Sequence, residues 1–376
     1  AWKKIELHSV SEQIVGIQSI DDSLYVISRS HLFIGMDNGI SSKLTEFEIP
    51  APSSYKKEVS LFETIWQLHS GELFGTPGKL YVDVLGFVTI FISLTGIVFF
   101  FLPGIIKKRK KKSKNIKKIS KLNKWSLKWH NKTGNWLFVF LLILYLTGMF
   151  LRPPLLIPIA NIKIPPIKFT HLDQSNPWYD KLRDLQYDKD RKTFILGTSE
   201  GLFSTTFNND KPLKFRNQPP ISVMGITVLE PFEKGAYLVG SFSGLFLWHP
   251  AHDQVFDYAK GQFYRGKSSG RPVGQFATSG VIKNRSGRLF MVDYNKGVQP
   301  LWHYDSFPKM PNQILEQSNM SLWNFALELH TGRIFSNILK DFYILLVPIS
   351  GLTSLLVLTS GYLFYRKRKR KKIESR

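Results

Sequence analysis

Residues 68–96 read LHSGELFGTPGKLYVDVLGFVTIFISLTG, a histidine motif that runs directly into a long apolar stretch. The apolar run Leu80–Leu102 has 23 residues. As a helix it would extend about 34 Å, which is enough to cross the hydrocarbon core of a bilayer. Two similar runs follow at Trp136–Pro158 and Leu339–Tyr365. The sequence therefore predicts a membrane protein with three helical crossings.

The formal net charge of +23 is concentrated beside these runs. Residues 104–134 carry 13 Lys and Arg and no acid, and residues 366–376 carry eight basic side chains and one Glu. Basic clusters that flank membrane helices face the cytoplasm, so both segments are predicted to lie on that side. The rest of the chain is nearly charge-balanced, which argues against a nucleic-acid partner. The chain contains no cysteine, so disulfides, thiolate nucleophiles and iron–sulfur clusters are excluded.

Three crossings with both basic segments inside place the N-terminus and the large central segment outside. An external N-terminus has to be exported, so we expect a fourth crossing, or a removed export signal, before Ala1. The expected organisation is an external β-rich segment (1–60), an interfacial and a transmembrane helix (61–103), a basic cytoplasmic loop (104–134), a transmembrane helix (135–158), an external β-rich domain (159–320), an interfacial and a transmembrane helix (321–365) and a basic cytoplasmic tail (366–376).

Short apolar runs bounded by Gly, Asp, Asn and Ser make residues 1–60 and 167–310 β-rich. GTSEGLF at 197–203 recurs as GSFSGLF at 240–246, an offset of 43 residues that lies within the period of a propeller blade. Looser echoes are SRSHLF at 28–33 and DYNKGV at 293–298. These hairpins fit either an ordinary sandwich or a propeller-like array with too few blades to close a ring. We expect the N-terminal segment to complete the domain that the second segment builds.

Three histidines stand beside the apolar runs. IWQLHSGELF at 65–74 and ALELHTGRIF at 326–335 share the pattern Leu-His-[Ser/Thr]-Gly-x-[Leu/Ile]-Phe. This places His69 and His330 at one membrane face. His130 precedes the second run at the other face, in a weaker copy of the pattern. Each run contains a Thr-Gly or Ser-Gly step that lets a helix or a flat ring approach the backbone closely (Thr95-Gly96, Thr147-Gly148 and Ser360-Gly361).

Neutral imidazoles are good axial ligands for haem iron, and two of them from neighbouring helices can hold one macrocycle. His69, His330 and His130 are therefore candidate haem ligands. The haem propionates would meet Lys79, Lys340 or Arg333. The alternative is that these histidines are interfacial anchors, packed at one edge and wet at the other. A second histidine pair, His249 and His252 in HPAH, is a candidate metal site, although such a pair is more often part of a polar loop.

These segments resemble the family of PepSY-associated transmembrane helix proteins, bacterial inner-membrane proteins that include siderophore-iron reductases. The resemblance rests on residues 68–96, 128–148 and 328–335 and touches all three apolar runs. It implies a four-helix membrane core, a periplasmic domain between helices and, in reductase members, haem b on helix-end histidines. His69 and His330 fall on the Leu-His-[Ser/Thr]-Gly motif, and His130 falls on a Trp-x-x-x-x-His-x-x-x-Gly motif. The opening helix of the family, with its own histidine, is not in this sequence, so the partner of His130 is open.

The expectation that follows is a haem-containing inner-membrane reductase that passes electrons to a periplasmic acceptor, chelated (siderophore) ferric iron. No GxGxxG occurs in the sequence, so no nucleotide-binding domain of that type is expected. The electrons would then come from a quinol or another electron donor in the membrane, and the helices would contact membrane lipid. The alternative function is a haem-free membrane sensor or interaction protein with a β-rich periplasmic binding domain.

The charge distribution makes a direct prediction about topology. A reporter placed near Lys112 and one fused after Arg376 should both report the cytoplasm, and one placed near Lys211 should report the periplasm, because Lys and Arg resist translocation. Alkaline phosphatase and green fluorescent protein fusions measure this. Phosphatase activity at Lys112 would overturn the arrangement.

Overall fold

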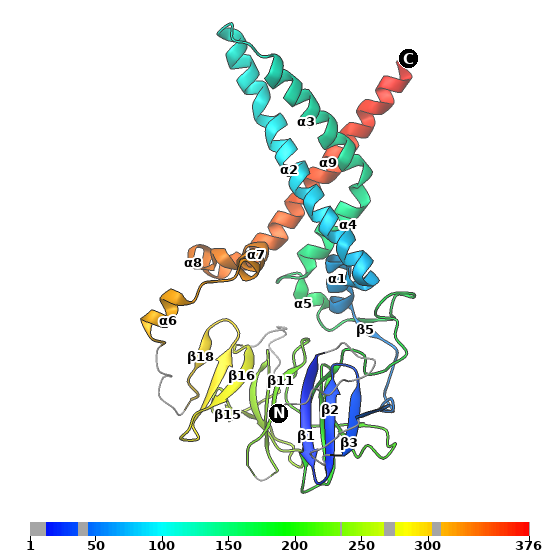
Figure 1. The fold of residues 1–376 in the computed structure, drawn as a ribbon, viewed down its shortest axis with the longest axis vertical. Helices are drawn as coiled ribbons and strands as arrows, with labels where there is room; N and C mark the ends of the chain where they lie inside the picture. The colour runs from blue at the N-terminus through cyan, green and yellow to red at the C-terminus, as the bar shows by residue number, and fades with distance from the viewer. Residues whose placement is uncertain (1–12, 37–43, 234, 267–274, 303–309, 376) are drawn as a thin grey trace, which may run out of the picture. The chain divides into compact units, whose positions relative to one another are not determined.

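The structure is a computed structural model that describes residues 13–36, 44–233, 235–266, 275–302 and 310–375. The chain divides into two compact units (Figure 1). One unit, called the β unit below, combines Ala1–Lys57 with Gln174–Ser318. The other, called the helical unit, combines Glu58–Asp173 with Asn319–Arg376. The N-terminal segment thus belongs to the same compact unit as the large central segment.

The β unit is built from four antiparallel sheets whose strands follow chain order. The first sheet is β1 (Ile14–Ile20), β2 (Ser23–Ser28), β3 (Leu32–Met36) and β4 (Thr45–Phe47). The second is β7 (Leu182–Asp188), β8 (Thr193–Thr198), β9 (Gly201–Thr205) and β10 (Leu213–Lys214). The third is β11 (Ile226–Pro231), β12 (Tyr237–Ser241), β13 (Gly244–Trp248), β14 (Phe256–Asp257) and β15 (Gln262–Phe263), and the fourth is β16 (Thr278–Lys283), β17 (Leu289–Asp293) and β18 (Gly297–Gln299).

The sequence echoes mark the same hairpin in each sheet. The second strand of every sheet ends at a buried residue with a short polar side chain: Ser28, Thr198, Ser241 or Asp293. Each of these side chains accepts a hydrogen bond from a backbone N–H of the turn that follows, as in the bond from Glu200 N to Thr198 Oγ1 at 3.0 Å. A side chain that satisfies the turn in this way fixes where the strand reverses. The four hairpins therefore repeat one local solution.

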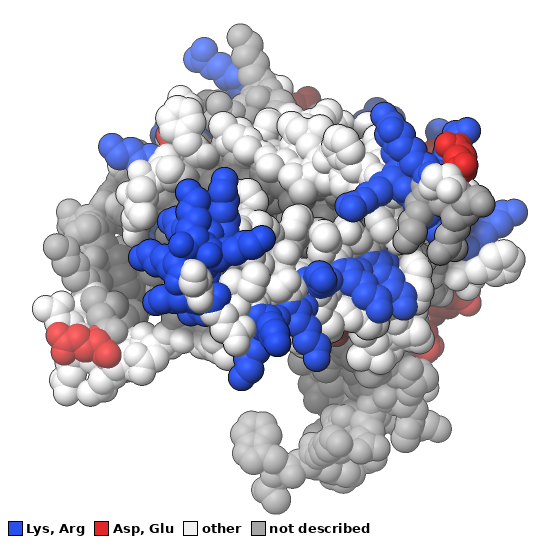
Figure 2. All heavy atoms as spheres, turned by 90° about the horizontal axis from the view of Figure 1, so that it is seen from above, with Lys and Arg blue, Asp and Glu red and all other residues white. Residues whose placement is uncertain are grey.

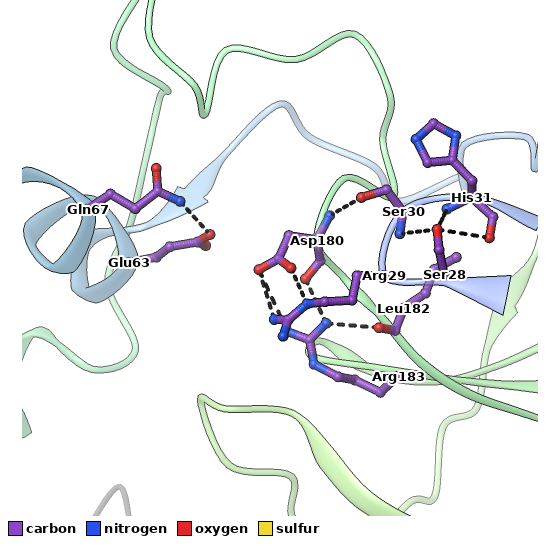
Figure 3. Close-up of polar contacts among 9 residues, drawn as sticks. All are labelled: Ser28, Arg29, Ser30, His31, Glu63, Gln67, Asp180, Leu182 and Arg183. Carbon is purple, nitrogen blue, oxygen red and sulfur yellow. Dashed lines mark hydrogen bonds and ion pairs between the residues drawn. The ribbon is translucent and has the colours of Figure 1, made fainter. Parts of the chain in front are cut away.

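Successive sheets pack through their first strands, since β1 contacts β7, β7 contacts β11 and β11 contacts β16. Between consecutive sheets lie three apolar cores, centred on Leu196, Trp248 and Met291. The sheets thus stack in chain order as blades do. The described residues form no closed propeller or barrel, in agreement with the expectation of too few blades to close a ring. Figure 3 shows one tie between the first two sheets, the ion pair between Arg29 and Asp180.

Asp184 lies half-buried on β7 at a bulge next to β1. Burial raises the pKa of its carboxyl group to about 7. The hydrogen bond donated by Leu185 N opposes the rise, and the neighbouring charge of Glu230 adds to it. The folded β unit therefore holds a proton that the unfolded chain releases near its ordinary pKa.

The helical unit begins with β5 (Val59–Ser60), which pairs with β6 (Lys163–Ile164). Its helices are α1 (Leu61–Ser70), η1 (Glu72–Phe74), α2 (Gly75–Lys111), α3 (Lys117–Trp136), α4 (Phe138–Phe150), α5 (Leu156–Ile159), α7 (Leu322–His330), η2 (Arg333–Phe335), α8 (Ser336–Leu339), η3 (Lys340–Leu345) and α9 (Leu346–Glu374). The short α6 (Asn312–Gln317) belongs to the β unit.

Two described stretches, Glu72–Lys111 and Arg333–Lys371, are long and apolar enough to cross a membrane. A third crossing requires α3 and α4 to count as one span, although they meet at a bend of 74°. The helix expected over 135–158 is shorter, because α4 ends at Phe150 before Pro153-Pro154, which cannot supply helical N–H groups. Its 13 residues extend only about 20 Å.

The segment expected as a basic loop at 104–134 is mainly helical. α2 continues to Lys111 and α3 starts at Lys117, so only five residues connect them. Lysine is a good helix former, and Leu122, Trp125 and Trp129 recur at helical spacing among the charges. The basic ends of α2 and α9 lie at the same end of the helical unit (Figure 1), and Lys and Arg gather on that face (Figure 2). This supports the prediction that both segments share one side.

The turn from α1 into α2 depends on two glycines in contact. Gly71 has a left-handed φ of 80°, and a Cβ on it would overlap the carbonyl group of Gly78. A Cβ on Gly78 would overlap the carbonyl oxygen of Gly71 and come within 2.9 Å of Phe74 Cβ. In the second copy of the motif, Leu339 stands seven residues after Gly332, where the first copy has Gly78. There the helix breaks between α8 and η3 instead of continuing.

The first prediction from the fold concerns Asp184. A raised acid pKa lowers stability as pH rises from about 4 to about 7, because the unfolded state loses its proton first. We expect Asp184→Asn to match the wild type at pH 4 and to open less often at pH 8. Hydrogen exchange of the β8 amides, compared between variants at the same pH, measures this. The exposed Asp22→Asn is the control, and equal exchange of Asp184→Asn and wild type at both pH values would contradict the prediction.

The second prediction concerns the glycine contact. Gly78→Ala should lower the free energy of unfolding in detergent by roughly 1–3 kcal/mol, because the new methyl group has no room. Gly104→Ala in the same helix has open space around its Cβ and should be neutral or stabilising by up to about 1 kcal/mol. Thermal unfolding followed by circular dichroism compares the two variants. Equal stabilities would show that the close approach is not needed.

Candidate functional site

The duplicated histidine motif folds the same way twice. Ser60 caps α1, and its side chain accepts a hydrogen bond from Glu63 N; Ser321 caps α7 in the same manner through Asn324 N at 3.2 Å. α1 ends at Ser70, one residue after His69, and α7 ends at His330; in both copies a glycine in the left-handed conformation lies two residues after the histidine. The serine nine residues before each histidine belongs to the repeat. The sequence analysis missed it, although the spacing is visible in the printed sequence.

Left-handed glycines stop both short helices just after their histidines. Gly71 has a φ of 80° and Gly332 a φ of 72°. The imidazole of each copy therefore projects from the last turn of a short helix rather than from the middle of a span. Short α-helices with fixed ends can set the height of a side chain at a membrane surface, and here the same device is used twice.

The structure brings His69 and His330 together. Their ring centres lie 6.0 Å apart, with the ring planes inclined by 35°. Metal–imidazole bonds of about 2 Å on the two sides of one ion place the ring centres about 6 Å apart. The separation of the two rings therefore fits a pair of axial ligands, and no backbone movement is needed to bring them to that distance.

His69 is oriented by the neighbouring helix α4. Its Nδ1 lies 3.1 Å from the Leu144 carbonyl oxygen and 3.2 Å from Thr147 Oγ1, and its ring lies against Gly148. Because a carbonyl oxygen only accepts, Nδ1 is the protonated nitrogen, and Nε2 keeps its lone pair for a metal. A Cβ on Gly148 would come within 2.9 Å of His69 Cε1. Burial, together with the neighbouring His330, lowers the pKa of His69, which favours the neutral form that ligation requires.

His130, on α3, is oriented by the neighbouring helix α2 in the same way. Its Nδ1 lies 3.0 Å from the Ile92 carbonyl oxygen and 3.3 Å from Thr95 Oγ1, and a Cβ on Gly96 would come within 3.2 Å of its Cε1. In both cases the threonine comes three residues after the residue whose carbonyl accepts the hydrogen bond, and the glycine comes directly after the threonine. The sequence flagged the Thr-Gly steps, but which histidine meets which step follows only from how the helices pack.

The third small-residue pair, Ser360-Gly361 on α9, resembles the two Thr-Gly pairs, but in the described residues no histidine lies against it. The Ser360 hydroxyl donates to the Val357 carbonyl oxygen at 3.0 Å. No described atom lies within 4 Å of the position that a Cβ on Gly361 would take. Among the described residues, His330 makes no contact of this kind. The third predicted ligand, His130, is likewise not paired with a second histidine in the described part of the chain.

The two histidine sites lie at different levels of the helical unit. The His69–His330 site adjoins the turn that leads into α2. The residues that contact His130, Ile92 to Gly96, follow Gly75 by 17 to 21 positions. At the helical rise this is roughly 25–32 Å further along α2, which is close to the thickness of a bilayer core.

The other predicted contacts are less well placed for a ligand. Lys79 pairs with Glu72 at 2.7 Å, and Arg333 pairs with Glu328 at 3.2 Å, so both cations already have carboxylate partners. Lys340 is exposed. In HPAH, the rings of His249 and His252 stack in parallel at 4.0 Å, an arrangement whose lone pairs do not converge on one ion. The described residues contain no cluster of three or more metal-ligating side chains.

The comparison with known proteins bears on the whole arrangement. The family model described as the PepSY-associated TM region matches residues 48–368, a range that contains both copies of the histidine motif and all three apolar runs. No curated protein and no solved structure matches the chain. The family match confirms the resemblance inferred from the sequence motifs. This chain therefore belongs to the PepSY-associated transmembrane family and is a membrane protein.

Proposed function

We propose that this protein binds haem b within the membrane and carries electrons from the side of its basic segments to the opposite side, where chelated ferric iron accepts them. The observation that carries the proposal is the His69–His330 pair. Two copies of one motif, more than 250 residues apart in sequence, present imidazoles at the separation that axial ligation requires. The same separation also occurs in packed aromatic pairs, so the duplication of the motif and the hydrogen bond that leaves Nε2 of His69 free are the features that favour ligation.

Several residues prepare this site for a metal. Leu144 and Thr147 hold the proton on Nδ1 of His69 and leave Nε2 as the ligand atom. Gly148 provides the flat seat on which the ring rests. Haem, when bound, supplies one-electron chemistry at a potential that its axial ligands and surroundings set. The protein's part is to fix the ligands, to shield the site with apolar side chains and to hold its charges.

The His130 site is the second haem position of this proposal. Ile92, Thr95 and Gly96 orient its ring as Leu144, Thr147 and Gly148 orient His69. The described residues supply no second imidazole for His130, and its partner ligand stays open. Two sites on opposite sides of the bilayer core divide a crossing that is too long for one site to serve both faces.

The remaining parts of the proposal concern location and partners. The basic ends of α2 and α9 would lie in the cytoplasm of a bacterium, with the β unit in the periplasm and the helices in the inner membrane. A quinol or a membrane protein would be the donor. The β unit offers the acceptor an open pocket lined by Leu247, Phe256 and Phe263 with His249 at its edge, a mixture of apolar and polar groups that is typical of binding sites.

The test is the absorption spectrum of the purified full-length protein. His69→Ala and His330→Ala should each abolish the same low-spin haem signal, because one iron needs both imidazoles. His130→Ala should leave that signal in place and remove a separate one. His249→Ala, which changes a histidine of the β unit, is the matched control and should leave every haem signal unchanged.

Two results would contradict the proposal. A purified protein without haem, after expression with added haem precursor, would favour the alternative of a haem-free membrane sensor. Unchanged spectra of both His69→Ala and His330→Ala would show that haem, if bound, is held elsewhere. In either case the 6.0 Å separation of the two rings would have only a packing role.

A further inference from the structure

Arg152 has two guanidinium nitrogens without a hydrogen-bond acceptor inside the helical unit. Its Nε and Nη2 are buried, and no described residue accepts a hydrogen bond from either atom. Buried donors that lack an acceptor are costly, so proteins rarely keep two of them on one side chain without use. Lys79 and Arg333, by contrast, have carboxylates beside them. Arg152 therefore marks a place where an anion is missing from the polypeptide itself.

The position of Arg152 relates it to both ligands of the His69–His330 site. Arg152 lies just beyond the end of α4 at Phe150, four residues after Gly148, the glycine against which the His69 ring rests. Its guanidinium carbon lies 5.8 Å from the centre of the Tyr343 ring. Tyr343 belongs to η3, whose backbone lies close to Gly332, two residues after His330. Arg152 thus follows the helix that contacts His69 and lies beside a segment that follows His330.

The two unpaired nitrogens define the kind of anion. Nε and Nη2 share one edge of the guanidinium group, and their N–H bonds run parallel along that edge. This edge matches the two oxygens of a carboxylate, which it binds through a pair of hydrogen bonds. A single-atom acceptor such as a carbonyl would satisfy only one of the two. The geometry therefore favours a carboxylate that comes from a bound molecule.

From this we infer that Arg152 binds a propionate carboxylate of the haem held by His69 and His330, through Nε and Nη2. The inference rests on the proposed function, since it requires haem at that site. It gives Arg152 a positioning role: the residue sets the rotation of the macrocycle about its ligand axis and places a positive charge beside it. A cation there favours the reduced, more negative form, so Arg152 raises the midpoint potential.

The experiment compares Arg152→Gln, Arg152→Lys and the wild type as full-length proteins in nanodiscs. Arg152→Gln should retain the low-spin spectrum, show a lower midpoint potential and release haem faster to apomyoglobin. Its potential should also depend more steeply on pH, because the uncompensated propionate takes up a proton more readily on reduction. Arg152→Lys keeps the charge but cannot donate two parallel hydrogen bonds, so its midpoint potential and haem release rate should fall between those of Arg152→Gln and the wild type. Arg370→Gln, which removes a cation paired with Glu374 near the far end of α9, is the matched control and should behave as wild type.

Haem dimethyl ester, which has no free carboxylate, separates this contact from a general effect of charge. Reconstitution with the ester should lower the stability of haem binding in the wild type and cause little further change in Arg152→Gln. Equal losses in both proteins would overturn the inference. An effect of Arg152 that appears only in nanodiscs of anionic lipid would also overturn it, by assigning the arginine to a lipid phosphate.

The outcome also separates this inference from the proposed function. If His69→Ala and His330→Ala abolish the signal while Arg152→Gln keeps the wild-type potential, pH dependence and haem release, only the assignment of Arg152 fails. If the histidine variants keep the signal, the proposed function itself fails. A variant that loses its thermal transition is replaced by Arg152→Lys, whose long side chain preserves most of the packing.

Discussion

The histidine sites depend on positions where a neighbouring helix has no side chain. The rings of His69 and His130 lie directly on Gly148 and Gly96, and the nearby threonine and carbonyl oxygen take the Nδ1 proton. Because the glycine has no Cβ, the imidazole comes close enough to hydrogen-bond a backbone carbonyl of the neighbouring helix. That carbonyl also accepts a hydrogen bond within its own helix. Small residues in membrane helices commonly permit close helix packing. Here the same property admits a flat aromatic ring.

The duplication has a consequence for how tightly each imidazole is held. In the His69 copy, the contact between Gly71 and Gly78 joins the short helix rigidly to the long one, and α4 then fixes the ring. In the His330 copy, Leu339 replaces the second glycine, the following helix is broken, and the described residues give the ring no hydrogen bond. The His69 imidazole is therefore preorganised, and the His330 imidazole has fewer contacts that fix its orientation. In the proposed haem site, this asymmetry would let the macrocycle enter from the side of His330.

The sequence predicted the parts of this site that depend on local pattern. The shared Leu-His-[Ser/Thr]-Gly pattern placed His69 and His330 at one level, and the structure brings them together. The Thr-Gly steps were visible, but the pairing of His69 with α4 and of His130 with α2 depends on helix packing that no local pattern encodes. Similarly, the GLF echoes revealed the β hairpins, whereas two-residue strands such as β14 are too short to carry a periodic signal. The bend between α3 and α4 lies where the basic segment meets the apolar run, and it was missed because the basic segment was expected to be a loop.

Most of the described buried side-chain atoms without a hydrogen-bond partner lie in the helical unit. Folded proteins pair nearly all their buried polar groups. Of the five described side-chain atoms that lack a partner, two belong to Arg152, beside the His69–His330 site. Gln67 Oε1 lies two residues before His69, and Asn123 Oδ1 lies seven residues before His130, on the same face of α3. Only Thr193 lies in the β unit. Four of the five atoms therefore belong to the helical unit, but they differ in kind: the two nitrogens of Arg152 need an acceptor such as a carboxylate, whereas the amide oxygens of Gln67 and Asn123 need a donor.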